Sequence, residues 1–412
     1  MFDRLFQNPR VLARQRTGPL AEERRRYLVY CGEQQMSPSH LQHIARYILV
    51  ITEALRLAER PGELITRMEI EAEANRRVRE RPKRRMLTFR FTGEAVRWLK
   101  FLGRLQVPAT VPSVYAEHVA EFADHLLQER GLSPKTVARD RWTTDQFLAQ
   151  IEAADLQPKN LTVAQVHELL AKKVRDSGYA RITIQTWASV LRRFFRFAEG
   201  RNWCRQGLAA AIMAPRVFKH EGLPVGPSWE DVKRLLAAAE GNRPADIRER
   251  ALLMLVAVYG LRAGEVTALC LKDFDWQREL LSVPHSKSQR PRIYPLCRPV
   301  GDAVLRYLRE VRPSSSFREV FLTLHAPRRP LSCCALWAIV ARRLRALGVS
   351  LPHYGPHALR HACATHLLSE GLSLKEVGDH LGHVDPDTTR IYAKVNVPAL
   401  RTVGDFSLEG LL

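Results

Sequence analysis

Apolar residues recur at spacings of three and four along most of this 412-residue chain, which is typical of amphipathic helices. After residue 111 the spacing predicts a first series of helices: 114–129, one that begins at Ser133-Pro134, 161–174 and 183–199. After residue 227 it predicts a second series: 228–239, 247–259, 300–311 and 331–347. Two short stretches, 280–283 and 293–296, favour strands. The pattern predicts a mainly α fold with a small antiparallel β-sheet.

Breaks in this pattern divide the chain into four parts. We expect a basic, mostly helical N-terminal region (1–111), a helical domain (112–214), a linker (215–227) and a second domain with a C-terminal tail (228–412). In the first part, residues 76–85 hold seven basic side chains around Glu80. This segment is either a solvated linker or an arm that follows nucleic-acid phosphates, because such contacts need only charge. The apolar tail is compatible with packing on its own domain or on a neighbouring copy.

The last sixty residues carry the most distinctive signals. They predict three short helices: one from Pro356 to Gly371, one that begins at Ser373, and one that begins at Asp385-Pro386 and carries Tyr392 near its end. A lone tyrosine is more often a core residue than a catalyst. A cationic cluster beside Tyr392 would favour its phenolate and make the side chain a nucleophile.

Such a cluster is present on the first of these helices. His357, Arg360 and His361 lie at positions i, i+3 and i+4, so they share one face. The face could simply be solvated, since exposed charge is the norm. A zinc site would need a Glu after the first histidine, where this chain has Ala358. An anion suits the face better, because Arg matches phosphate oxygens and His can pass a proton near neutral pH.

The overall charge points to a polyanionic partner. The chain has 64 Lys and Arg against 43 Asp and Glu, a net charge of +21. Nucleic acid is the commonest partner of such a protein, and an anionic membrane surface is the rival interpretation. No apolar run is long enough to cross a bilayer, and the N-terminus lacks the apolar core of a secretory signal. Seven cysteines without a C-x-x-C pair favour a reducing cytoplasm.

Basic residues also gather inside the helical domain, where we expect nucleic-acid phosphates to bind. Lys135, Arg139 and Arg141 lie at the start of a predicted helix, where backbone amides and cations both favour phosphate. The other predicted DNA contacts are Arg181, Arg192 and Arg193 in this domain, and Arg290 and Arg292 beside the connection of the two strands. We expect Trp187, Phe194, Phe195 and Phe197 to belong to the core instead of stacking on bases.

The C-terminal signals together match a known pattern. The series His357-x-x-Arg360-His361, Leu381-Gly382-His383 and Tyr392 resembles the signature of the tyrosine recombinases, the phage-integrase and Xer type. That resemblance calls for an upstream Arg in a Gly-Leu-Arg-x-x-Glu turn and a Lys in a β-hairpin further on. Both are present, as Arg262 in residues 260–265 and as Lys287. The resemblance implies a helical core-binding domain followed by a catalytic domain, and says little about residues 1–111.

The resemblance also implies roles for these residues. Tyr392 attacks a DNA phosphorus and forms a 3′-phosphotyrosyl bond, while Arg262 and Arg360 hold the two non-bridging oxygens. Lys287 protonates the departing 5′ oxygen. His357 and His383 complete the hydrogen-bond shell of the phosphate, with His357 as the expected acceptor of the Tyr392 proton. His361 and Glu265 are expected to support the others, Glu265 by orienting Arg262 or its turn. No metal ion, ATP or other cofactor is expected.

The implied activity is site-specific recombination, with four identical or mixed protomers on two double-stranded DNA sites, no membrane partner, and a cytoplasmic location at the bacterial nucleoid. Two alternatives stay open: a catalytically silent DNA-binding accessory subunit, and strand relaxation of the type IB topoisomerase kind. The long N-terminal region favours a mobile element over a short chromosome-dimer resolver. Integration, resolution and transposition share this chemistry.

Overall fold

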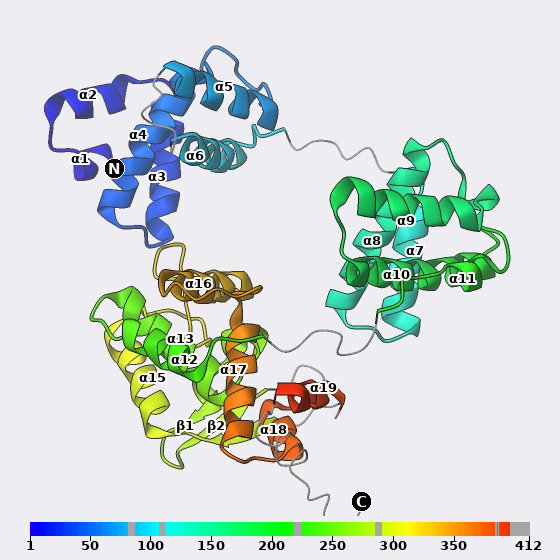
Figure 1. Ribbon diagram of the computed structural model, residues 1–412. Coiled ribbons are helices and arrows are strands. Elements are labelled where there is room, and N and C mark those ends of the chain that lie inside the picture. Colours follow the sequence, from blue (N-terminus) through cyan, green and yellow to red (C-terminus); the bar gives the residue numbers. More distant parts are fainter. Residues whose placement is uncertain are drawn as a thin grey trace, which may run out of the picture. The chain divides into compact units, whose positions relative to one another are not determined.

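The structure is a computed structural model that describes residues 1–80, 87–106, 113–217, 225–284, 291–383, 385 and 387–395. The chain divides into two compact units, one made of Met1–Val107 with Gly222–Leu412 and the other of Pro108–Glu221 (Figure 1). The second unit contains the helical domain expected at 112–214. The boundaries predicted from the sequence stay predictions.

The N-terminal part of the first unit is helical, as the sequence predicts. Its helices are α1 (Phe2–Leu5), α2 (Pro9–Thr17), α3 (Ala21–Glu33), α4 (Pro38–Ala54), α5 (Arg67–Glu80) and α6 (Leu87–Phe101). They enclose a hydrophobic core of their own, in which Leu28, Ile48 and Trp98 are fully buried. The basic segment 76–85 begins in the last turn of α5, and its residues 81–86 lie outside the described part of the chain.

The second unit consists of helices packed around a separate core. They are α7 (Ala116–Asp124), the π-helix η2 (His125–Glu129), α8 (Pro134–Ala153), the short 3₁₀ turn η3 (Pro158–Asn160), α9 (Val163–Ser177), α10 (Arg181–Gly200) and α11 (Leu208–Ala211). Two of their starts are capped by side chains: the side chain of Ser133 accepts from the Thr136 amide, and Thr162 forms a capping box with Gln165. The helix predicted at 114–129 differs, because a wide π turn replaces its last α-helical turn.

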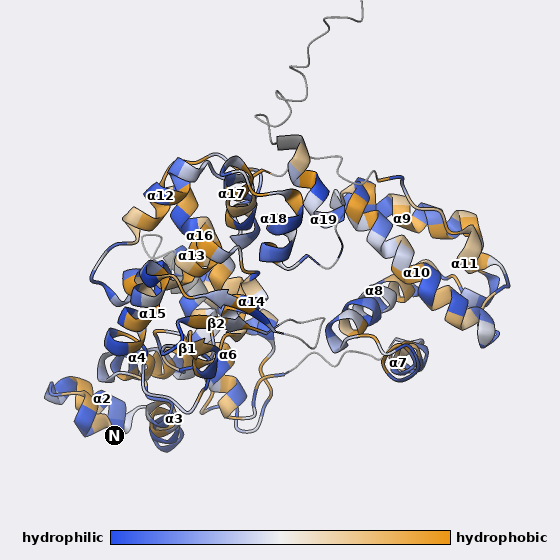
Figure 2. Ribbon diagram, turned by 90° about the horizontal axis from the view of Figure 1, so that it is seen from below, coloured by the Kyte–Doolittle hydropathy of each residue, from blue (hydrophilic) through white to orange (hydrophobic). Residues whose placement is uncertain are grey.

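The four aromatic residues that the sequence assigns to the core of this unit lie in that core or against it. Trp187, Phe194 and Phe195 are buried in the core, and Phe197 packs against it half-buried. Trp142, whose spacing matches the apolar side of its helix, is 53% exposed and packs edge-on against Trp187. Figure 2 shows apolar and polar residues along each of these helices, as amphipathic helices require.

The C-terminal part of the first unit combines helices with one small sheet. Its helices are α12 (Trp229–Ala238), α13 (Pro244–Tyr259), α14 (Ala263–Ala268), α15 (Arg298–Glu310), α16 (Cys333–Ala346), α17 (Pro356–Ser369), α18 (Leu374–Leu381) and α19 (Asp387–Arg390), with 3₁₀ turns η4 (Leu271–Asp273) and η5 (Ile391–Val395). The antiparallel strands β1 (Phe274–Asp275), β2 (Leu280–Val283) and β3 (Arg292–Pro295) lie in the order β1-β2-β3. The fold class predicted from the sequence is confirmed.

Two local predictions differ from this result. β3 begins at Arg292, one residue earlier than expected, because Arg292 pairs with Val283. The last predicted helix breaks into α19 and η5, so Tyr392 lies in a 3₁₀ turn and not in an α-helix.

The core of this part is organised around α13. Residues 251–257 of this helix are all buried, and it packs against α15 and α17. A helix buried on every side fixes the position of its own end, so the chain leaves α13 at Gly260 in a defined place. Among the described residues, no helix is both long and apolar enough to cross a membrane. All seven cysteines are free.

Candidate active site

The end of α13 places Arg262. Gly260 has a φ of +60°, a left-handed conformation that suits glycine at a helix end. A Cβ atom there would lie 2.4 Å from Leu381 Cδ2, so the close approach of α18 also requires glycine. Two residues later, Arg262 precedes α14 as its N-cap. The Gly-Leu-Arg turn thus directs the guanidinium of Arg262 towards the end of α18.

Glu265 holds two guanidinium groups. Its carboxylate accepts from the backbone amide and from Nη1 of Arg262, both at 2.9 Å. Nη2 of Arg292, from β3, lies 2.7 Å from the same carboxylate without the alignment of a hydrogen bond. Burial raises the pKa of Glu265, but the contacts to Arg262 and Arg292 lower it more, so the net shift is downward and the carboxylate stays ionised. The predicted support of Arg262 by Glu265 is confirmed.

Arg360 is buried and fixed by backbone carbonyls. It lies on α17 with 4% exposure, and it donates from Nη1 to the carbonyl oxygen of Gly260 and from Nη2 to that of Leu381, the second at 2.8 Å. Burial, and then the charge of Arg262, lower its pKa to about 10. A guanidinium with that pKa is still charged at neutral pH. Two of its five N–H donors are used by these carbonyls, which leaves donors for an anion.

The end of α18 brings His383 into the same cluster. Gly382 ends the helix with a φ of +66°, and its carbonyl oxygen accepts from Nη2 of Arg262 at 3.2 Å. Nδ1 of His383 lies 2.7 Å from Oγ1 of Thr389, a buried residue of α19. Burial, and then the charge of Arg360, lower the pKa of His383 to about 4. The imidazole is therefore neutral.

Tyr392 lies in this cluster as well, and its partner is His361. The tyrosine is 2% exposed, and its hydroxyl oxygen lies 2.8 Å from Nδ1 of His361. Burial raises the pKa of Tyr392 to about 12, although the charges of Arg360 and Arg262 act to lower it. The nearby cations therefore do favour the phenolate, as expected, but the loss of solvent outweighs them and the phenol keeps its proton.

Most of the predicted catalytic residues meet here. Arg262 and Arg360 act electrostatically on His357, His383 and Tyr392, which places all five side chains in one cluster. His357 is exposed at its edge. Lys287 and Arg290 lie outside the described residues. Within those residues, no group of His, Cys, Asp or Glu side chains could hold a metal ion.

Two of the predicted DNA contacts of the helical unit, Arg139 and Arg193, share one acidic partner. Asp140 is fully buried and accepts two hydrogen bonds from Arg139 on one oxygen and two from Arg193 on the other, at 2.6 to 3.0 Å. Arg192 donates from Nε to the carbonyl oxygen of Ile212 at 2.9 Å. The remaining predicted contacts of this unit, Lys135, Arg141 and Arg181, have exposed side chains.

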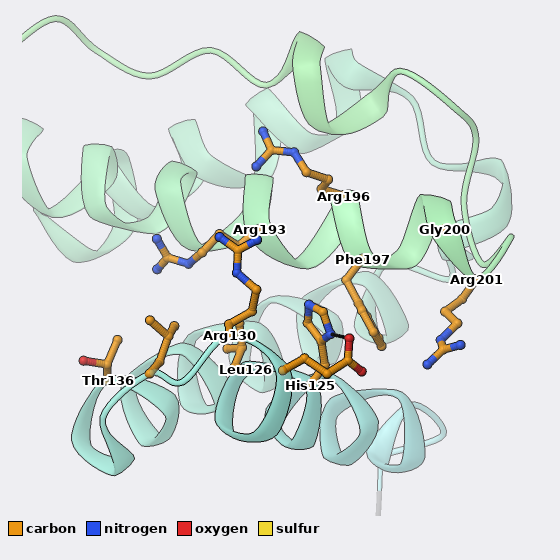
Figure 3. A pocket seen from close by; sticks show the side chains of 11 residues that line it. His125, Leu126, Arg130, Thr136, Arg193, Arg196, Phe197, Gly200 and Arg201 are labelled. Carbon is orange, nitrogen blue, oxygen red and sulfur yellow. Dashed lines mark ion pairs between the residues drawn. The ribbon is translucent and has the colours of Figure 1, made fainter.

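Two basic hollows border the arginines that Asp140 holds. One of about 570 Å³ is lined by Arg139, Arg192 and Arg193 together with Gln185 and Ser189. The other, of about 650 Å³, lies between α10 and the turn that joins η2 to α8 (Figure 3). Arg193 belongs to both, so the residue that Asp140 holds lies between two surfaces that suit anions.

Sequence reasoning missed four residues of these sites. It placed Arg292 among the DNA contacts, whereas the structure places it beside Glu265 with 15% of its side chain exposed. It gave His361 a supporting role without the contact to Tyr392, and it did not single out Thr389 or Asp140. Position along the chain gives no signal for these contacts. An Asp among the basic residues of one helix is the one hint that the sequence offers.

The comparisons with known proteins agree with this geometry. The sequence model described as "Phage integrase family" matches residues 228–398, and that of "Phage integrase, N-terminal SAM-like domain" matches residues 119–202. The first match includes the whole cluster around Tyr392, and the second lies inside the helical unit. Residues 1–118 lie outside both.

Individual relatives point the same way. A Sinorhizobium fredii protein named as an integrase/recombinase, y4rA, is 35% identical over 296 residues, which cover 71% of each chain. The tyrosine recombinase XerD of Listeria monocytogenes is 27% identical over 290 residues, which cover 69% of this chain and 96% of XerD.

A lambda integrase tetramer bound to a Holliday junction shares the fold, with a TM-score of 0.53 at 19% identity over 73% of this chain and 85% of its own. This structural similarity shows the fold alone, whereas the sequence matches show the family. The chain belongs to the phage integrase family of tyrosine recombinases.

Proposed function

We propose that this protein is a site-specific recombinase that cuts and rejoins DNA strands through a 3′-phosphotyrosyl intermediate. The observation that carries the proposal is the position of the buried Tyr392 hydroxyl, in one cluster with the guanidinium groups of Arg262 and Arg360. A nucleophile beside two fixed cations suits attack on a phosphodiester, whose equatorial oxygens gain charge in the transition state.

The reaction divides among the cluster as follows. The Tyr392 oxygen forms a bond to phosphorus while the bond from phosphorus to the 5′ oxygen breaks. Arg262 and Arg360 hold the two non-bridging oxygens, and Lys287 gives a proton to the departing 5′ oxygen. His383, fixed through Nδ1 by Thr389, offers its other ring nitrogen to the phosphate. Attack by a second strand's 5′ hydroxyl then restores the phosphodiester and releases Tyr392.

We further propose that the helical unit grips the DNA duplex through Lys135, Arg139, Arg141, Arg181, Arg192 and Arg193. Recombination needs two DNA sites, and the lambda integrase tetramer on a Holliday junction is the kind of assembly that would serve here. Four protomers, identical or mixed, are therefore proposed. The DNA substrate places the activity at the bacterial nucleoid, in the cytoplasm, and the long N-terminal region favours a mobile element.

A nicked suicide substrate tests the activity. DNA recovered from the covalent adduct of the wild-type protein in cells supplies the site, and the purified protein is then incubated with a nicked version of it. Wild type should give a covalent protein–DNA band and Tyr392→Phe should give none. Absence of the band with wild type would contradict the proposal and would favour a silent accessory subunit.

A second measurement separates recombination from relaxation. Two labelled copies of the recovered site should exchange strands in the presence of wild type. Covalent adducts together with relaxation of supercoiled DNA, but without exchange between sites, would favour a topoisomerase activity instead.

A further inference from the structure

The structure gives the phenol of Tyr392 a hydrogen-bond partner that can accept its proton. Its oxygen lies 2.8 Å from Nδ1 of His361, and within the described residues no other side chain makes a hydrogen bond to it. The two rings come from different elements, α17 and η5, and tilt against each other with centroids 5.6 Å apart. The contact is therefore built by the fold and not by neighbours along the chain.

The protonation states of the two side chains determine which of them donates the hydrogen bond. Burial raises the pKa of the phenol to about 12, so Tyr392 keeps its proton at neutral pH. Burial, and then the charges of His357 and Arg360, lower the pKa of His361 to about 4, so the imidazole is neutral. A neutral imidazole has one acceptor nitrogen. The phenol therefore donates to Nδ1, and the imidazole proton lies on Nε2.

The other two histidines of the cluster are placed differently. His383 uses Nδ1 on Thr389, and His357 is exposed at the edge of the cluster with no hydrogen bond among the described residues. Both therefore suit contact with phosphate oxygens better than contact with the phenol. The sequence alone favoured His357 as the acceptor of the Tyr392 proton.

We propose that His361, and not His357, receives the proton of Tyr392 as the phenol attacks phosphorus. This inference rests on the recombinase function proposed above. The O–H bond of Tyr392 breaks, its proton goes to Nδ1 of His361, and its electron pair forms the bond to phosphorus. The bond to the 5′ oxygen breaks in the same displacement, and Lys287 protonates that oxygen. Rejoining runs in reverse, and His361 returns its proton to the phenol.

The bound DNA makes this transfer easier. In the DNA-free protein, His357 and Arg360 on the same helix, with His383 nearby, oppose an imidazolium at position 361. A phosphodiester held by Arg262 and Arg360 brings a negative charge that offsets theirs, which favours the imidazolium. The base thus becomes stronger only when the substrate is in place.

Two substitutions at position 361 separate proton transfer from positioning. In His361→Asn, the amide oxygen can accept the hydrogen bond of the phenol but cannot take its proton, and His361→Ala removes both properties. At saturating nicked DNA of the recovered site, both variants should form the covalent adduct about 100-fold more slowly or worse, since general bases contribute about 10²- to 10⁴-fold. A wild-type rate in His361→Asn would overturn the proposal and leave His361 a positioning residue.

His366→Ala is the matched control. His366 lies on the same helix but stacks on Trp229, with ring centroids 3.9 Å apart, so its loss should leave the rate unchanged. Thermal unfolding of all three variants checks that each is folded. A wild-type protein that forms no adduct at all would instead contradict the recombinase function, so the two failures are distinguishable.

A fluorinated tyrosine at position 392 gives an independent test, in which each variant is compared with and without the fluorine. Fluorine lowers the pKa of the phenol, so less help from a base is needed. The substitution should partly restore the rate of His361→Ala but not that of His357→Ala, whose defect lies in phosphate contacts. Rescue of His357→Ala alone would assign the proton to His357 and overturn the proposal.

Discussion

The catalytic cluster and the helical unit both use a buried carboxylate to hold arginine side chains in place. In each, one buried carboxylate holds two arginines from different elements: Glu265 holds Arg262 and Arg292, and Asp140 holds Arg139 and Arg193. Side-chain exposure alone does not separate the two pairs. Arg292 is 15% exposed and Arg262 35%, against 51% for Arg139 and 34% for Arg193.

The difference lies in what else each arginine contacts. Arg360, the most buried of the set, is fixed by two backbone carbonyls, and Arg262 donates to a third. Such groups cannot move to follow a substrate, so they define one place for one phosphate, as transition-state stabilisation requires. Arginines that contact no such carbonyls, as proposed for Arg139 and Arg193 on DNA, would instead follow a run of phosphates and supply affinity without a fixed geometry.

Substitution of Arg360 should have the largest effect. Arg360→Ala should slow formation of the covalent adduct by about two to four orders of magnitude at saturating DNA, because oxyanion contacts contribute on that scale. Binding of the recovered DNA site should persist, since the proposed DNA contacts of the helical unit do not involve Arg360. Rate and affinity are measured separately, by single-turnover cleavage and by fluorescence anisotropy.

Arg360→Lys controls for the carbonyls that the alanine variant leaves without a donor. Lysine keeps the charge and can reach one carbonyl, but it loses the planar fork. An intermediate rate is expected, together with thermal unfolding close to that of wild type. Cleavage that is unchanged in both variants would remove Arg360 from the site.

The two carboxylates offer a sharper comparison, with effects of intermediate size. Glu265→Gln should lower the cleavage rate at saturating DNA by roughly 10- to 100-fold, because a hydrogen bond to a charged group is worth about 1.5–3 kcal/mol. Asp140→Asn should leave that rate unchanged and instead raise the dissociation constant for DNA several-fold. A slower cleavage step in Asp140→Asn at saturating DNA would show that Asp140 affects cleavage and not only DNA affinity.

Much of the fold could be predicted because helix caps and spacing are local signals. Ser133, Thr162, Ser228 and Ser373 cap helices where the sequence places them. Glycine at position 260 could be interpreted in the same way, as a helix end before a functional turn. The identity of the cluster followed from motif spacing, which needs no coordinates.

The contacts within the cluster could not be predicted, because they depend on how distant elements pack. His361 and Tyr392 are 31 positions apart, and Arg292 and Glu265 are 27 apart, so no local pattern relates them. The sign of the pKa shift of Tyr392 also depends on burial, which the sequence does not give for a single residue. The cations are visible in the sequence, whereas the loss of solvent that outweighs them is not.

The pH dependence of the DNA-free protein gives a smaller effect. The folded pKa of His361 and of His383, about 4 in each case, lies below the usual value of 6.5, so the unfolded chain takes up protons first as the pH falls. These residues therefore stabilise the fold above pH 6.5, and this stability is lost as the pH falls towards 4. Histidine NMR should show two rings that stay neutral at pH 5.5 and titrate at a higher pH once DNA is bound. Ordinary titration near 6.5 without DNA would contradict the burial of the cluster.

The smallest effect is expected from the basic segment 76–85. Arg76 and Arg77 already face Glu73 within α5, at 2.8 and 3.6 Å, so part of the segment's charge is offset inside the helix. Replacing its seven basic residues with glutamine should lower the slope of log Kd against log salt by roughly one or two, since each phosphate contact contributes about 0.9. Cleavage at saturating DNA should not change, because the guanidinium groups of the catalytic cluster stay in place. An unchanged salt slope would make the segment a linker and would leave DNA affinity to the half-exposed arginines of the helical unit.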